Sequence, residues 1–253
     1  MLVTPVKTRP LVPPKDDLFA VMRDVLSRLE ENSILVVTSK VVSIGQGRCV
    51  TKAQYPDKDA LVQKEADQFL PRDFVPNRWV MHTLKYNLFI PSAGIDESNG
   101  NEYYILWPRN PMGTAKEVYD WARETYHIKN LGVVITDSHT IPMRRGTLGI
   151  SLGHWGFTPI KDYRGDKDIF GRELVMQVAD IADGLAAAAV LVMGEGKETT
   201  PLAVITDVPF VTFTDTPYVP TKPFSSFEIE MEEDLYYPLL SSVPWQKGGG
   251  GVN

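Results

Sequence analysis

Residues 131–137 read LGVVITD, an apolar run that carries no charge before its last residue, Asp137. Such a run predicts a short strand buried on both faces, because a strand with one wet face would alternate apolar and polar side chains. The stretch 33–44, SILVVTSKVVSI, is rich in β-branched residues and predicts a second buried strand. PLAVITDVP at 201–209 predicts a third strand, which ends the regular part of the chain.

Helical patterns surround these strands. Thr114 and Glu117 have the spacing of a capping box and predict a helix that reaches about Lys129. An Ala-rich stretch predicts a longer helix over 173–193. The remaining predicted elements are a strand at 2–7, a helix from a cap at Asp16 and Asp17 to about Glu31, a helix at 57–69, paired strands at 77–91 and a strand at 102–107. Because strands and helices mix without strict alternation, the predicted class is α+β, with mixed sheets and flanking helices.

The composition excludes several classes of protein. The 253 residues carry 32 acidic and 26 basic side chains, so a basic surface for nucleic acid is not expected. The longest apolar run, 185–193, has 9 residues, whereas a membrane span needs roughly 18. The first residues lack a secretory apolar segment and the single Cys49 cannot form an intrachain disulfide, so we expect a cytoplasmic protein. We expect one ligand-binding domain over 1–210, which could comprise two intertwined subdomains, and a C-terminal extension over 211–253 whose GGGG stretch predicts a disordered end.

Three acids lie at the ends of apolar elements that are far apart in the sequence. Asp96 lies in SAGIDESN (92–99), Asp137 precedes Ser138, and Glu195 follows the Ala-rich helix. If these groups converge, they form an oxygen-only site of the kind that holds Mg²⁺ or Mn²⁺ together with nucleotide phosphates. Each acid also has a purely structural interpretation, as part of a polar turn, a cap after a strand or a helix C-cap.

The segment 142–174 is rich in glycine and arginine. Its arginines could bind phosphates or carboxylates in a bidentate manner, or could form surface ion pairs with the interleaved acids. These arginines are Arg144, Arg145, Arg164 and Arg172. His139 is kept as a candidate because it lies beside Asp137, although the histidines lack metal-site spacing. Phosphate-loop, dinucleotide-binding and serine-hydrolase motifs are absent from the sequence.

Five segments, in this order, resemble the coenzyme F420-0:L-glutamate ligase family: AGIDESN, VVITDS, RGTLGISLG, DYRGDKDIFGREL and LAAAAVLVMGE. The resemblance extends over about residues 3–210. It implies the α+β fold of that family, an intertwined homodimer, GTP as phosphate donor, Mg²⁺ or Mn²⁺, and room for a K⁺ ion. The implied reaction phosphorylates a carboxylate, and the amine of L-glutamate then attacks the acyl phosphate.

The same resemblance assigns roles to individual residues. It places one metal ion on Asp96 and Asp137 and a second on Ser138 and Glu195. The candidate nucleotide contacts are Arg9, Pro10, Leu11, Val12, Ser39, Lys40, Asn99, Gly194 and Gly196. The candidate catalytic residues are Asp137, Arg144 and Arg164.

The sequence departs from the family pattern at Ile44, at 108–115 and at 138–145. These differences resemble a bacterial branch described as folate γ-glutamyl ligases, so we expect a GTP- and metal-dependent ligase that adds L-glutamate to a carboxylate of a folate or similar pterin. Two alternatives stay open, namely an F420-0 deazaflavin acceptor and a non-catalytic GTP-binding regulator. The aromatic residues of 211–253 predict either a tail that lines the acceptor pocket or one that is simply docked on the body.

Overall fold

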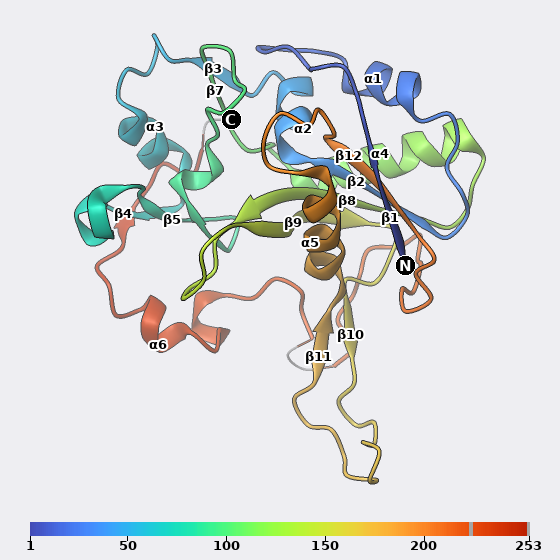
Figure 1. Cartoon of the computed structure of the whole chain (residues 1–253). Helices are drawn as coiled ribbons and strands as arrows, with labels where there is room; N and C mark the ends of the chain where they lie inside the picture. Colours follow the sequence, from blue (N-terminus) through green and yellow to red (C-terminus); the bar gives the residue numbers. More distant parts are fainter. Residues whose placement is uncertain (223–224, 252–253) are drawn as a thin grey trace.

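The computed structural model describes residues 1–222 and 225–251 (Figure 1). Its central sheet has the strand order β1-β12-β2-β8-β9. These strands are β1 (Leu2–Val6), β2 (Ser33–Thr38), β8 (Leu131–His139), β9 (Leu148–Trp155) and β12 (Leu202–Thr206). Strands β2 and β8 are parallel and the other neighbours are antiparallel, so the sheet is mixed. The predicted α+β class with mixed sheets and flanking helices is therefore confirmed.

Both faces of this sheet are covered by helices. One face packs against α1 (Leu18–Val25), α2 (Ser39–Gly45) and α4 (Pro111–Tyr126), and the other packs against α5 (Ile181–Met193). Alternate side chains of β2 enter the two cores, with Leu35 on the first face and Ile34 on the second. This explains the continuous apolar run, because each successive side chain meets a helix.

A smaller sheet lies beside the central one, with the order β13-β4-β5-β6. Its strands are β4 (Gln68–Leu70), β5 (His82–Lys85), β6 (Leu88–Pro91) and β13 (Gln246–Lys247), and α3 (Lys58–Glu65) packs nearby. A separate pair joins β3 (Cys49–Thr51) to β7 (Tyr103–Ile105). The buried carboxylate of Glu65 lies 2.7 Å from Arg48 and 3.1 Å from Lys85, so an ionic group links α3 to β5.

Several predicted boundaries of helices are wrong. Residues 39–45 form α2 rather than the second half of a strand, because a short buried helix and a buried strand share the same apolar composition. Helix α4 begins at Pro111, and its N-cap is Asn110, which accepts a bond from the Gly113 amide, rather than Thr114. Helix α1 ends at Val25, six residues before the predicted end at Glu31.

The glycine-rich segment contains a strand that the sequence pattern does not reveal. Strand β9 pairs along β8, and a Cβ at Gly149 would lie 2.4 Å from the carbonyl oxygen of Ala186. Glycine there lets α5 approach the sheet closely. After β9, the hairpin of β10 (Ile160–Asp162) and β11 (Val178–Asp180) projects away from the body as an arm (Figure 1). Helix α5 starts only at Ile181, after the arm, and not at residue 173.

The C-terminal extension crosses the surface as loops, short turns of helix and a last strand. Its helical turns are Met231–Glu233 and α6 (Tyr237–Leu240); the other 3-10 turns of the chain are Arg72–Phe74, Pro76–Arg78 and Ser92–Gly94. Residues 248–251 are ordered, contrary to the prediction, because their four amides donate to the carbonyls of Asp67, Gln63, Ala66 and Lys64 at the end of α3. A Cβ at Gly248 would lie 2.0 Å from the Ala66 oxygen, so this contact requires glycine. Within the described residues, every helix is too short or too polar to cross a bilayer.

Candidate active site

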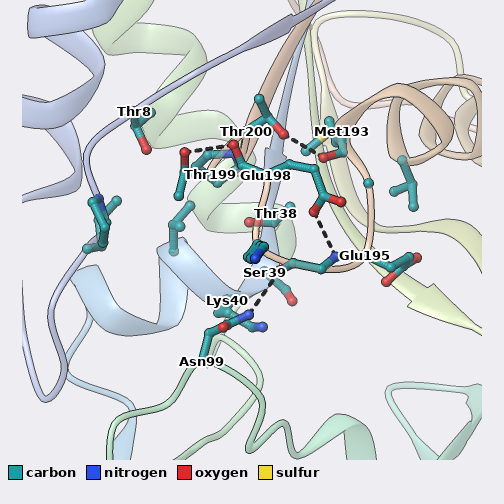
Figure 2. A pocket seen from close by; sticks show the side chains of 18 of the residues that line it. Thr8, Thr38, Ser39, Lys40, Asn99, Met193, Glu195, Glu198, Thr199 and Thr200 are labelled. Atoms are coloured by element: carbon teal, nitrogen blue, oxygen red, sulfur yellow. Dashed lines mark hydrogen bonds between the residues drawn. The ribbon is translucent and has the colours of Figure 1, made fainter.

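A cavity of about 290 Å³ opens where the parallel strands β2 and β8 end (Figure 2). Its walls come from the loop at 8–11, the start of α2, the end of β8 and the loop at 194–201. The predicted site residues that line it are Arg9, Pro10, Leu11, Ser39, Lys40, Asp96, Asn99, Asp137, Ser138, Gly194, Glu195 and Gly196. The sequence-derived set is thus largely brought together by the fold.

A second cavity of about 300 Å³ adjoins the first. The two share the residues Ser39, Lys40, Asp96, Asp137, Ser138 and Glu195. The second cavity adds apolar residues of β6 and the loop after it, and also Trp107, His139 and Thr147. The candidate acids and Lys40 therefore face two separate spaces, which suits a reaction between two bound partners.

Among the residues that line both cavities, Lys40 and Asp96 form an ion pair. The Lys40 ammonium lies 2.6 Å from Asp96 Oδ2, and it donates to the carbonyl and the hydroxyl of Ser98 at 3.2 and 3.1 Å. Burial alone would raise the pKa of the Asp96 carboxyl, but the charge of Lys40 and its hydrogen bond outweigh burial, so the net pKa lies below its usual range. Asp96 is therefore an ionised oxygen donor at neutral pH.

Asp137 is positioned by the end of β8. Its Oδ1 accepts from the Ser138 amide at 2.8 Å, and its Oδ2 accepts from the indole N–H of Trp107. Burial raises the pKa of the Asp137 carboxyl to about 6, helped by the nearby charge of Asp96 and opposed by these two hydrogen bonds. Trp107 is not among the predicted site residues, because an indole in a predicted strand most often belongs to the core.

Glu195 contacts other residues than the ones that hold Asp96 and Asp137. Its Oε1 accepts from the hydroxyl of Thr147 at 3.1 Å. The loop that carries it is held by the side-chain amide of Asn99, which donates to the Gly196 carbonyl at 3.0 Å, and by Glu198, which accepts from the Gly196 amide at 2.8 Å (Figure 2). Within the residues that the structure describes, no three acidic, histidine or cysteine side chains approach closely enough to hold a metal ion. A single ion bound by three such side chains is therefore not formed here, and the assignment of one ion to Asp96 and Asp137 and of a second to Ser138 and Glu195 stays a prediction.

The donor set nevertheless fits a hard divalent cation. Asp96 and Asp137 offer ionisable oxygens on a shared wall, and Mg²⁺ is usually held by one or two carboxylates, with substrate phosphates and water as the other ligands. Two protein carboxylates are sufficient for that mode of binding, and Ser138 adds a hydroxyl on the same wall.

The remaining candidates lie outside both cavities. Arg164 is in the arm, where its guanidinium binds Asp162 in a bidentate manner at 2.7 and 3.0 Å. Arg144 is exposed in the turn between β8 and β9 and donates to the Met143 carbonyl. Val12 is exposed beyond the part of the first loop that lines the cavity. No described residue after Pro201 lines either cavity, so the structure does not support a tail that forms the pocket beside the acids.

Comparison with known proteins agrees with this arrangement. The chain matches the F420-0:Gamma-glutamyl ligase family over residues 7–207. It is 31% identical to the coenzyme F420:L-glutamate ligase of Methanopyrus kandleri, over 80% of this chain and 85% of that protein. It is 34% identical to the protein of the same name from Methanococcus maripaludis, over 80% of each chain, and 32% identical to that of Archaeoglobus fulgidus, over 80% of this chain and 86% of the relative. With a match that covers most of its length and includes the acids of both cavities, this chain belongs to the F420-0:gamma-glutamyl ligase family.

Proposed function

We propose that this protein joins L-glutamate through an amide bond to the carboxylate of an F420-0-type acceptor, with GTP as the phosphate donor and a divalent metal ion in the site. The observation that carries the proposal is the shared wall of Lys40, Asp96 and Asp137 between two cavities. The relatives named above act, by their names, on coenzyme F420. They favour the deazaflavin acceptor over the folate acceptor that the sequence departures suggest.

Amide formation from a carboxylate needs activation, because the carboxylate oxygen is a poor leaving group. In the proposed reaction an acceptor carboxylate oxygen attacks the γ-phosphorus of GTP, and GDP leaves. The amine of glutamate then attacks the carbonyl carbon of the acyl phosphate, and inorganic phosphate leaves as the amide forms. Such phosphoryl transfer depends mainly on positioning and on offsetting negative charge.

The residues of the shared wall supply these two functions. Lys40, which lines the first cavity, would bind phosphate oxygens with its ammonium group. Asp96 and Asp137 would hold the divalent ion, which offsets the charge of the phosphates when it is bound. The first cavity is proposed for the nucleotide, because the loops at 8–11 and 194–201 surround it, and the second for the acceptor carboxylate and glutamate.

The proposed assembly is a homodimer built around the arm. Ile169 and Phe170 at the tip of the arm are 92% and 89% exposed, and Met176 on its returning side is 71% exposed. Apolar side chains presented on a projecting hairpin are typical of a surface that a partner covers. A second copy of the chain is the partner that the family resemblance implies.

The reaction is tested by measuring GDP release with every combination of substrates. A ligase should release GDP in quantity only when GTP, Mg²⁺, glutamate and acceptor are all present, and the acceptor should gain the mass of a glutamyl unit. F420-0 and tetrahydrofolate, supplied separately, distinguish the two acceptor classes. A protein that binds GTP but releases no GDP with either acceptor would be the regulator and would overturn the proposal.

The variant Asp137→Asn tests the assigned site in the same assay. It should lower turnover at least about 100-fold, because loss of a carboxylate ligand weakens the hold on the divalent ion that offsets the charge of the transferring phosphate. The matched control is Asp120→Asn, which removes an exposed carboxylate of α4 that pairs with Lys116. Full activity in Asp137→Asn would show that the reaction does not use this wall.

A further inference from the structure

The side chain of Trp107 lies directly behind the candidate metal ligand Asp137. We propose that Trp107 is a positioning residue: its indole N–H fixes the plane of the Asp137 carboxylate so that the free lone pairs face the cavities. The inference rests on the proposed function, because it assumes that Asp137 binds the divalent ion. It gives a role in the site to a residue other than the acids, Lys40 and the two loops of the proposed function.

The carboxylate of Asp137 is held at both of its oxygens. The Ser138 amide donates to Oδ1 at 2.8 Å, and the Trp107 indole donates to Oδ2. An ionised carboxylate has about four lone-pair directions, so two remain for a ligand. With a donor on each oxygen the group cannot rotate without breaking a bond, and its free lone pairs keep one direction. An outer hydrogen bond of this kind orients a metal ligand before the ion arrives.

The indole is itself fixed, so it can act as a rigid support. Trp107 is 1% exposed, and its ring stacks on Tyr86 with centroids 6.1 Å apart and planes at 18°. Its carbonyl accepts from Nε of the buried Arg48 at 3.1 Å. Both the side chain and the backbone of Trp107 are therefore held by neighbours other than Asp137.

Gly94 allows this placement. Its φ is +68°, and a Cβ built there would lie 2.1 Å from the indole Nε1 and Cε2 atoms of Trp107. The turn that leads to Asp96 thus passes over the edge of the indole with no space for a side chain. The edge of the ring that donates to Asp137 is the same edge that the turn before Asp96 meets, so Trp107 contacts the segments of both carboxylates of the proposed site.

A purely structural role makes a different prediction. In that case Asp137 only satisfies a buried indole N–H, and the loss of Trp107 would lower stability without a specific effect on metal binding. Metal affinity, measured apart from turnover, separates the two roles. Replacement of an outer hydrogen-bond partner typically weakens metal binding about 10- to 100-fold.

The experiment compares Trp107→Phe with Trp155→Phe by calorimetric titration of Mn²⁺ in the presence of a non-hydrolysable GTP analogue. Trp155 is the matched control, because its indole N–H is buried and makes no hydrogen bond in the part of the chain that the structure describes. Trp107→Phe should bind Mn²⁺ at least about 10-fold more weakly, and Trp155→Phe should bind it as the unchanged protein does. Replacement of Trp107 by benzothienylalanine, which keeps the bicyclic shape and lacks the N–H, should reproduce the loss even if the phenylalanine variant folds poorly.

Two outcomes overturn the inference in distinguishable ways. Unchanged Mn²⁺ affinity in both Trp107 variants, with loss of binding in Asp137→Asn, would remove the positioning role and leave the proposed site in place. Unchanged affinity in Asp137→Asn would show that the ion does not use this carboxylate, and the inference would then fail together with that part of the proposed function.

Discussion

The Lys40 ammonium lies 2.6 Å from Oδ2 of Asp96, and both side chains line both cavities. A lysine paired with a candidate metal ligand acts as an internal counter-ion, since it neutralises the acid when no other cation is near. The arrangement predicts an exchange of partners, in which the metal ion takes Asp96 and Lys40 turns to the phosphates.

Lys40→Met should therefore change two affinities in opposite directions. Without the competing ammonium, Mn²⁺ in the absence of nucleotide should bind several-fold more tightly. GTP should bind about 10-fold more weakly, because a charge-assisted contact to phosphate contributes about 1.5 kcal/mol or more. Calorimetric titration of each ligand measures both changes. Lys52→Met, which removes an ammonium 3.8 Å from Glu97, is the control for loss of charge alone. Parallel weakening of both ligands in Lys40→Met would contradict the exchange.

The sequence predicts the acids of the candidate site better than it predicts the residue that holds one of them in place. Asp96 and Asp137 were found because acids at the ends of apolar elements lie where a fold can bring them together. Trp107 could not be found in that way, since its partner is 30 residues away and only the packing of β7, β8 and Gly94 defines the contact. Arg144 and Arg164 fitted a binding pattern by composition, but composition does not tell which way the β8–β9 turn and the arm project.

The elements of the fold also differ in how well the sequence predicts them. The buried strand at 131–137 was correct because a continuous apolar run has few alternatives in a mixed sheet. The segment 39–45 was not, because Val41 and Val42 suit a buried strand as well as a buried helix. Strand β9 was missed since Gly149 and Gly153 indicate a loop by propensity, whereas here they allow α5 and α4 to approach the sheet.

His154 should make the stability of the protein depend on pH. The ring is 5% exposed, lies between Phe157 and Phe227, and burial lowers its pKa to about 4. Below about pH 6.5 the unfolded chain gains a proton at this histidine that the folded chain does not, so the contribution of His154 to the free energy of unfolding should fall by up to roughly 3 kcal/mol as pH drops to 4. The raised pKa of Asp137 contributes with the opposite sign over part of this range, so the His154 contribution is read from a comparison with a variant. Urea unfolding between pH 7 and 4 measures this loss.

The variant His154→Leu should remove the His154 contribution, so its free energy of unfolding should fall less between pH 7 and 4 than that of the unchanged protein. His127→Asn, which replaces an exposed histidine at the end of α4, should keep the slope of the unchanged protein. If His154→Leu retains the full slope, other groups are responsible and the buried imidazole is not the cause.

Assembly should depend on the arm. Phe170→Asp places a charge on an apolar tip that we propose to be covered by a second copy, so the variant should be monomeric while the unchanged protein is a dimer at micromolar concentration. A stable dimer interface of this kind buries more than about 2,000 Å². Light scattering gives the masses, and Trp79→Asp, at another exposed aromatic, is the control. A monomeric unchanged protein would contradict the proposed assembly directly.

The C-terminal extension should contribute to the stability of the protein rather than to binding of the acceptor. Phe213 and Phe227 pack against the core beneath α5, and Trp245 meets Phe89 edge-on at 6.3 Å; Phe224 lies outside the described residues. These three rings are half-buried, so the loss of each should cost less than the roughly 3–5 kcal/mol of a fully buried aromatic, but the deletion removes all of them together. Deletion of residues 211–253 should therefore lower the melting temperature strongly.

A shorter deletion separates the two possible roles of the extension. Removal of residues 246–253 takes away β13 and the glycines that cap α3 but leaves Phe213, Phe227 and Trp245 in place. Stability should fall modestly, by about 1–2 kcal/mol for the lost hydrogen bonds. Because no described tail residue lines either cavity, KM for GTP and KM for the acceptor should change by the same factor. A selective rise in the acceptor KM at unchanged melting temperature would place the tail in the acceptor pocket after all.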